Sequence, residues 1–212
     1  MTWRLPMRSG KGMAEMKRTI LFVNACVREG SRTLRLAKRV LSHLDGEVRE
    51  INLEREQLCP LTGEALARRE AILQSGDLDA PMLRHAQAFA EADEIVLAAP
   101  YWDLSFPASV KTYFEQINVL GVTFSYGPDG NPVGLCHAKR LYYVMTAGGP
   151  ILPPNHGYAY VRDLATNFYG IPETVPFSAE LLDVAGSDPE RILHEAEGRI
   201  DAFFEDRRSF GS

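Results

Sequence analysis

The sequence is poor in the residues that stabilise small secreted domains or hold metal ions. Its three cysteines, Cys26, Cys59 and Cys136, are odd in number and far apart, and none belongs to a Cys-x-x-Cys pair. The five histidines are scattered singly, so neither residue type has the spacing of zinc ligands. We therefore expect no disulfide framework and no metal site. Such cysteine usage is typical of a reducing compartment and indicates a cytoplasmic protein.

Long apolar segments and concentrated charge are also missing. The longest uninterrupted apolar run, residues 95–102, is far shorter than the roughly 20 residues that a membrane-spanning helix needs. The 23 basic and 28 acidic residues give a net charge of −5, whereas nucleic acids and anionic membranes favour a concentrated basic face. We expect neither a nucleic acid nor a membrane as a partner.

Three motifs of nucleotide-binding proteins and hydrolases do not occur. The sequence contains no Gly-x-Gly-x-x-Gly turn, no Gly-x-x-x-x-Gly-Lys-Ser/Thr phosphate loop and no Gly-x-Ser-x-Gly nucleophile turn. These absences disfavour a dinucleotide-binding fold, a P-loop protein and a serine hydrolase.

The sequence does contain a regular alternation of buried strands and helices. Apolar β-type runs predict strands at 19–23, 48–53, 95–99, 140–146 and 173–177. Helical patterns fall between them, at 31–44, 62–75, 82–91, 105–120 and 158–168, and a last helix starts at Pro189. Ser105 is interpreted as the N-cap of its helix. Turn residues within 121–136 predict a short hairpin-like excursion.

Apolar strands that alternate with helices require a parallel sheet covered on both faces. We therefore predict one flavodoxin-like, doubly wound α/β domain over residues 17–212, with five parallel strands in the order 2-1-3-4-5. Residues 1–16 are basic and lack the apolar stretch of a signal peptide. We interpret them as a flexible leader.

Ligands of open parallel sheets bind at the carboxyl ends of the strands, and the first loop at this edge suits a phosphate. Loop 24–33 brings Ser31 and Thr33 to the start of a helix, where unpaired amides attract anions. Arg28 and Arg32 can add positive charge. The alternative is an ordinary helix capped by Ser31, with arginines that are merely solvated.

Two further loops at the same edge are also unusual. After the third strand, Tyr101 and Trp102 can form the wall of a flat ligand. Phe106 can equally well pack in the core. After the fourth strand, the pair Gly148 and Gly149 lets a ligand approach the backbone closely, although an ordinary turn would also use glycine.

Together, the three loops resemble those of the flavodoxin-like NAD(P)H quinone oxidoreductases and FMN-dependent azoreductases. The similarity extends over about residues 17–204. It is most specific in four segments: Ala99-Pro100-Tyr101-Trp102, Lys111-Thr112-Tyr113-Phe114-Glu115, Gly121-Val122-Thr123-Phe124-Ser125-Tyr126 and Thr146-Ala147-Gly148-Gly149.

This resemblance implies an enzyme that works with a flavin. Members of the family are homodimers with a flavin at each subunit interface, and they reduce quinones, azo dyes or nitro compounds by a ping-pong mechanism. We expect FMN, with FAD as the alternative, and NADH or NADPH as the electron donor.

The resemblance also implies roles for particular residues. The flavin phosphate would be bound by Ser31, Arg32 and Thr33, with Arg28 as a further charge. One side of the flavin ring would face Pro100, Tyr101, Trp102, Asp103 and Leu104, and its polar edge would face Thr146, Ala147, Gly148 and Gly149. The substrate pocket would include Phe106, Phe124 and Tyr158, with Phe124 near the partner subunit. His156 is the nearest match to a charge-relay histidine.

One position departs from the family pattern. The azoreductases have a serine six residues before the Ser-x-Ser/Thr pair, where this chain has Ala25. Two alternatives stay open beside the enzyme, and Ala25 motivates the second of them. One is a one-electron carrier like flavodoxin, which shares the fold and an acidic charge, and the other is a flavin-free ligand-binding domain.

Overall fold

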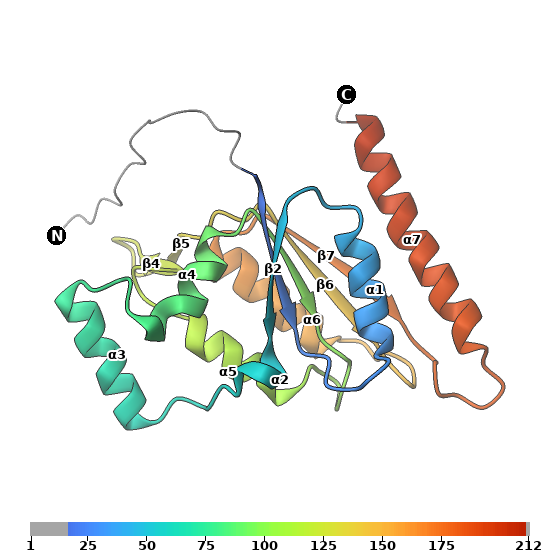
Figure 1. Cartoon of the computed structure of the whole chain (residues 1–212), viewed down its shortest axis with the longest axis horizontal. Coiled ribbons are helices and arrows are strands. Elements are labelled where there is room, and N and C mark those ends of the chain that lie inside the picture. Colours follow the sequence, from blue (N-terminus) through green and yellow to red (C-terminus); the bar gives the residue numbers. More distant parts are fainter. Residues whose placement is uncertain (1–16, 211–212) are drawn as a thin grey trace.

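A sheet of five parallel strands forms the centre of the molecule (Figure 1). The structure is a computed structural model that describes residues 17–210, so the leader proposed for residues 1–16 lies outside the described part. The strands are β1 (Thr19–Asn24), β2 (Glu47–Asn52), β3 (Glu94–Ala98), β6 (Arg140–Thr146) and β7 (Glu173–Ala179). Their order is β2-β1-β3-β6-β7. This is the predicted order 2-1-3-4-5 of the main strands, which is thereby confirmed.

Helices cover both faces of the sheet. One face packs against α1 (Arg32–Leu41) and α7 (Pro189–Phe210), and the other against α4 (Arg84–Glu91), α5 (Ala108–Ile117) and α6 (His156–Leu164). Figure 1 shows these two groups of helices on opposite sides of the strands. The remaining helical pieces are α2 (Leu53–Glu56), α3 (Gly63–Ser75), a 3-10 turn (Pro81–Leu83) and a π-helical turn after α6 (Ala165–Tyr169).

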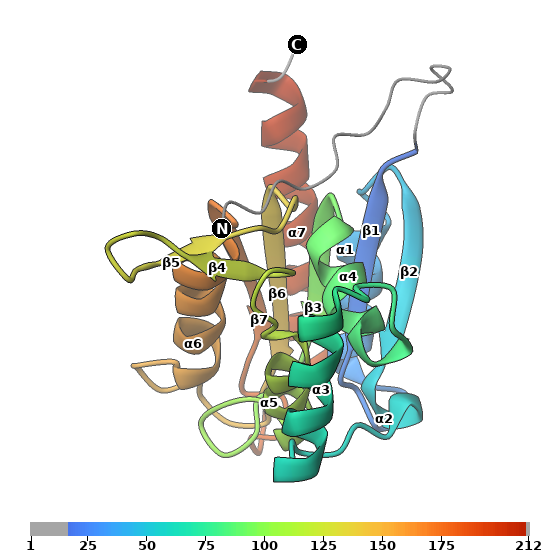
Figure 2. The same cartoon turned by 90° about the vertical axis from the view of Figure 1, so that its left-hand side faces the viewer.

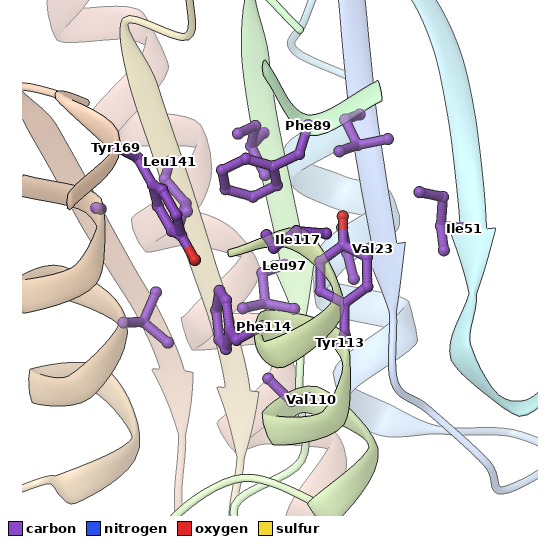
Figure 3. Packing of buried hydrophobic residues seen from close by; sticks show 14 of the residues in the cluster. Val23, Ile51, Phe89, Leu97, Val110, Tyr113, Phe114, Ile117, Leu141 and Tyr169 are labelled. Atoms are coloured by element: carbon purple, nitrogen blue, oxygen red, sulfur yellow. The ribbon is translucent and has the colours of Figure 1, made fainter. Parts of the chain in front are cut away.

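The alternation of side chains along β1 explains why two separate cores form. Leu21 and Val23 point into one cluster, whereas Ile20 and Phe22 point into the other. Successive residues of a strand face opposite sides of the sheet. All four side chains are buried, because helices cover both sides. Figure 3 shows the cluster on the α4–α5–α6 face, where Phe89, Phe114 and Tyr169 pack over the strands.

The sequence-based boundaries need two corrections in particular. Ser105 is not a helix cap, since α5 begins at Ala108 with Pro107 at the cap position. Ser105 instead exchanges backbone hydrogen bonds with Trp102. Strand β2 is not covered on both faces, because its first four residues are exposed. It is an edge strand, and only its carboxyl end reaches the core.

The predicted excursion is a true hairpin. Strands β4 (Phe124–Tyr126) and β5 (Pro132–Gly134) pair antiparallel, and Figure 2 shows them on the side of the molecule away from β2. A Cβ on Gly134 would overlap the backbone of Tyr169 and Gly170, so the hairpin packs directly on the π-helical turn. Among the described residues, no helix combines the length and the hydropathy needed to cross a bilayer.

Ion pairs join α1 to α7 across the surface. Arg35 binds Glu197 at 2.7 Å, and Arg39 binds Asp201 at 2.6 Å. His43 also lies 2.7 Å from Asp201. The long last helix is therefore held to the sheet by its apolar face and to the α1 region by this row of charges.

Candidate functional site

A pocket of about 370 Å³ opens at the carboxyl edge of the sheet. The carboxyl ends of the strands lie at the bottom of Figure 1. The strand order reverses between β1 and β3, which is where ligands of doubly wound sheets bind. Loops that follow four strands line the pocket: Val27, Arg28, Glu29, Gly30, Ser31, Arg32, Thr33, Pro100, Tyr101, Trp102, Thr146, Ala147, Gly148, Leu182 and Asp183. Three of the four loops are those predicted from the sequence.

The loop after β1 presents the start of α1 to this pocket. Gly30 has a φ of +68°, a conformation that glycine adopts without strain. The Ser31 hydroxyl caps the helix by accepting from the amide of Leu34 at 3.3 Å. The amides of Arg32 and Thr33, in the first turn, have no carbonyl partner within the helix. This end of the pocket therefore carries oriented N–H donors and a partial positive charge.

A pair of hydroxyls connects this loop to the loop after β6. The Thr33 and Thr146 side-chain oxygens are 2.5 Å apart, and both residues are buried. One hydroxyl donates to the other, so the pair is a direct polar link between the two segments. Thr33 is therefore both a pocket residue and a tether between β6 and α1.

The loop after β3 is held in a tight turn. Trp102 and Ser105 exchange backbone hydrogen bonds of 2.9 and 2.8 Å. The two residues between them, Asp103 and Leu104, both have positive φ, 49° and 68°. This conformation is unfavourable for non-glycine residues and is often found at binding sites. The turn leaves the Trp102 side chain 37% exposed at the pocket rim.

The loop after β7 was not predicted as part of the site. Leu181, Leu182 and Asp183 donate their amides to the carbonyls of 147–149 at 3.0, 3.2 and 2.9 Å. The Asp183 carboxylate also binds Arg32 at 2.7 Å. Within the described chain, the amides of residues 148 and 149 have no acceptor, so they are free to donate to a ligand. The available signal for this loop was its position, since it follows the fifth strand at the same edge of the sheet.

Most of the predicted cofactor residues lie in the pocket wall, and a few do not. Arg28, Ser31, Arg32, Thr33, Pro100, Tyr101, Trp102, Thr146, Ala147 and Gly148 line the pocket. Asp103, Leu104 and Gly149 are adjacent in sequence but outside the lining. Ala25, the departure from the family pattern, is buried at the start of the first loop.

The residues predicted for the substrate pocket are engaged elsewhere in this chain. Phe106 packs edge-on against Tyr160 at a centroid distance of 5.6 Å. Phe124 is buried and packs against Phe168 in the hairpin region. Tyr158 hydrogen-bonds to Thr174 at 3.2 Å.

His156 begins α6 and is exposed. It is not among the pocket-lining residues. None of these four residues therefore touches the pocket within the described chain.

Two tyrosine hydroxyls and one thiol near the carboxyl edge of the sheet are buried. The hydroxyls of Tyr101 and Tyr143 are buried and have no hydrogen-bond partner among the described residues. Burial raises the pKa of Tyr143 well above its usual range, so this hydroxyl stays protonated. Burial also raises the pKa of the Cys26 thiol, which disfavours the reactive thiolate at this position. No three acidic, histidine or cysteine side chains of the described residues come together as metal ligands.

The fold and the site define a protein of the flavodoxin-like class. A family model described as the flavodoxin-like fold matches residues 18–204, and the chain belongs to that family. An FMN-dependent NADH:quinone oxidoreductase from Coprothermobacter proteolyticus is 33% identical over 84% of this chain and 93% of its own length. A second such protein, from Clostridium acetobutylicum, is 36% identical over 82% of this chain and 92% of its own length. The predicted family is confirmed.

Solved structures agree on the fold. An azoreductase from Bacillus anthracis has a TM-score of 0.75 and 22% identity, covering 89% of this chain and 99% of that chain. An FMN-dependent NADH-azoreductase from the same species, solved in complex with FMN, has a TM-score of 0.74 and 20% identity, covering 89% and 98%. At these identities the likeness supports the shared fold.

Proposed function

We infer that the protein is an FMN-dependent oxidoreductase that transfers hydride from NADH to quinone or azo acceptors. The observation that carries this conclusion is the pocket at the switch point of the sheet, in a chain that matches quinone oxidoreductases over nearly their whole length. Bound FMN supplies the chemistry that accepts and returns the two electrons. The protein contributes binding, orientation and charge.

The residues of the pocket fit this cofactor. The pocket volume of about 370 Å³ lies in the range of roughly 300–1,000 Å³ that is usual for small-molecule sites. The start of α1, with Arg28 and Arg32 beside it, supplies donors and positive charge for a phosphate. Trp102, at the other wall, is flat and partly exposed, as suits contact with a ring.

The loop after β6 would bind the polar edge of the ring. The carbonyls of Gly148 and Gly149 accept hydrogen bonds from the amides of Asp183 and Leu181. Their own amides donate to no acceptor in the described chain. Donors fixed in advance stabilise negative charge without reorganisation. The backbone of this loop, rather than a side-chain acid, would therefore favour the reduced and more negative form of the ring.

The quaternary structure and the cellular location follow from the same proposal. We expect a homodimer, since the family implies it and the β4–β5 hairpin exposes Tyr126 and Val133 by 56% and 49%. We expect a cytoplasmic protein, because all three cysteines in the described chain are unpaired.

The test is the visible absorption spectrum of the purified protein, recorded without oxygen before and after addition of NADH. A two-banded flavin spectrum that NADH bleaches, and that a quinone restores, supports the proposed enzyme. A flavin that NADH fails to bleach supports an electron carrier instead. If no flavin is retained even after reconstitution with FMN, the proposal is wrong and Ala25 becomes the first residue to examine.

A further inference from the structure

An ion pair between Arg32 and Asp183 closes one side of the pocket. The Arg32 Nη1 atom donates to Asp183 Oδ1 at 2.7 Å and to the carbonyl of Leu182 at 3.4 Å. Both side chains line the pocket. They come from loops 151 positions apart in the sequence, after the first and the fifth strand of the sheet.

The surroundings of Asp183 fix its carboxylate beside this arginine. The Asp183 amide donates to the carbonyl of Gly148 at 2.9 Å. A Cβ on Gly148 would overlap the Asp183 carboxylate, so the glycine leaves the space that this side chain occupies. Asp183 therefore touches both the start of α1 and the loop after β6.

The ion pair uses only part of the donor capacity of Arg32. A guanidinium carries five N–H groups, and within the described chain every hydrogen bond of the Arg32 side chain is made by Nη1. The Nε and Nη2 groups therefore stay available. A long, flexible arginine loses side-chain entropy when it binds a ligand, and a fixed partner removes much of that cost beforehand.

Resting on the proposed function, we propose that Asp183 is a positioning residue for the flavin phosphate. It holds the Arg32 guanidinium at the phosphate end of the pocket, with its remaining donors free. The opposite effect, repulsion of the phosphate by the carboxylate, is weak because the Asp183 side chain is 62% exposed and water screens it.

The experiment compares the affinities of two flavins for the apoprotein, measured by quenching of flavin fluorescence. FMN carries the phosphate, and riboflavin is the same ring and chain without it. Asp183→Ala removes the contact with Arg32, whereas Asp183→Asn keeps an oxygen that can accept from it. Asp77→Ala is the control, because Asp77 is exposed and its side chain has no partner in the described chain.

We expect Asp183→Ala to raise the Kd for FMN about two- to fivefold, the range expected when an exposed ion pair is lost, and to leave the Kd for riboflavin unchanged. Asp183→Asn should keep most of the FMN affinity of the wild type, and Asp77→Ala should behave like the wild type. In an Arg32→Ala background, Asp183→Ala should cause no further loss. Circular dichroism and the Tm of each apoprotein check that the variants are folded.

Three results would overturn the inference. Equal losses for FMN and riboflavin would mean that Asp183 acts through the loop after β6. Tighter FMN binding by Asp183→Ala would mean that repulsion dominates. FMN binding that is unchanged in Asp183→Ala contradicts the inference while the proposed function stands, whereas a wild-type protein that binds neither flavin contradicts both.

Discussion

The hydroxyl pair of Thr33 and Thr146 is the shortest polar contact between the loops of the site. Both residues are buried and their side-chain oxygens are 2.5 Å apart. Replacing either threonine by valine keeps the shape but leaves the other hydroxyl without its partner. We expect each single variant to lower the free energy of unfolding by about 1–3 kcal/mol, as measured by urea denaturation of the apoprotein.

The double variant separates this explanation from a simple packing defect. Thr33→Val combined with Thr146→Val removes both polar groups, so its cost should be clearly smaller than the sum of the two single costs. Thr33→Ser keeps the hydroxyl and serves as the control. Strictly additive costs would show that the two hydroxyls do not depend on each other.

His156 is the residue for which sequence and structure lead to different expectations. The resemblance assigns it a charge-relay role, but in the structure it is exposed and outside the pocket lining. Removal of a general acid or base costs about 10²–10⁴-fold in rate. We expect His156→Ala to reduce kcat by less than tenfold, a loss below that range, with FMN binding unchanged. Complete loss of flavin reduction in stopped-flow experiments, with FMN still bound, would establish a catalytic role.

At the residue scale, the sequence predicts the loops better than it predicts the direction of their aromatic side chains. Trp102 lies in the pocket wall, and its predicted contact with the flavin ring stays a prediction. For Phe106 the sequence left core packing open, and the side chain packs against Tyr160. Phe124 packs against Phe168 of its own chain. Such choices depend on long-range packing that no local pattern contains.

At the scale of elements, the contact between α1 and α7 makes stability depend on pH. Hydrogen bonds from Arg39, and secondarily from His43, lower the pKa of Asp201 to about 2 from its ordinary value of 3.8. A depressed pKa contributes stability that is fully present above the unfolded pKa and is lost as the pH falls through the folded pKa. The contribution of Asp201 should therefore disappear between about pH 4 and pH 2.

The measurement is urea denaturation of the wild type and Asp201→Asn between pH 7 and pH 3. Because the pair is near the surface, we expect a difference of about 0.2–1 kcal/mol at pH 7 that begins to shrink below pH 4. Asp206→Asn, an exposed position on the same helix, is the control and should show no such loss. A difference that stays constant over this range would contradict the assignment.

The sequence predicted the buried elements reliably because their patterns are local. Strands β1, β3 and β6 are almost fully buried, and each is a continuous apolar run. The interpretation of Ser105 as a helix cap is wrong. A serine just before a proline-containing helix start gives the same local sequence signal whether it caps the helix or lies in a turn. The site loop around Asp183 was missed because its composition is ordinary, and its role comes from the strand order that brings it beside Arg32.

At the scale of the whole molecule, the β4–β5 hairpin lies outside the central sheet of the single chain. Its two strands form a sheet separate from the central one, and a two-stranded hairpin is marginal without a surface to pack on. One side rests on the π-helical turn through Gly134, while Tyr126 is 56% exposed. A large exposed aromatic side chain on a projecting element is typical of a protein interface.

We therefore expect the wild type to sediment at twice the chain mass of 23.6 kDa, and Tyr126→Asp to weaken the dimer at least tenfold, as for the loss of an interface aromatic residue. The control is Leu66→Asp on α3, an apolar residue with 40% exposure on a different element, which should leave the dimer intact. Sedimentation equilibrium over a range of protein concentrations measures both dissociation constants. A monomeric wild type, or an equal effect of the two variants, would mean that the hairpin is not the interface.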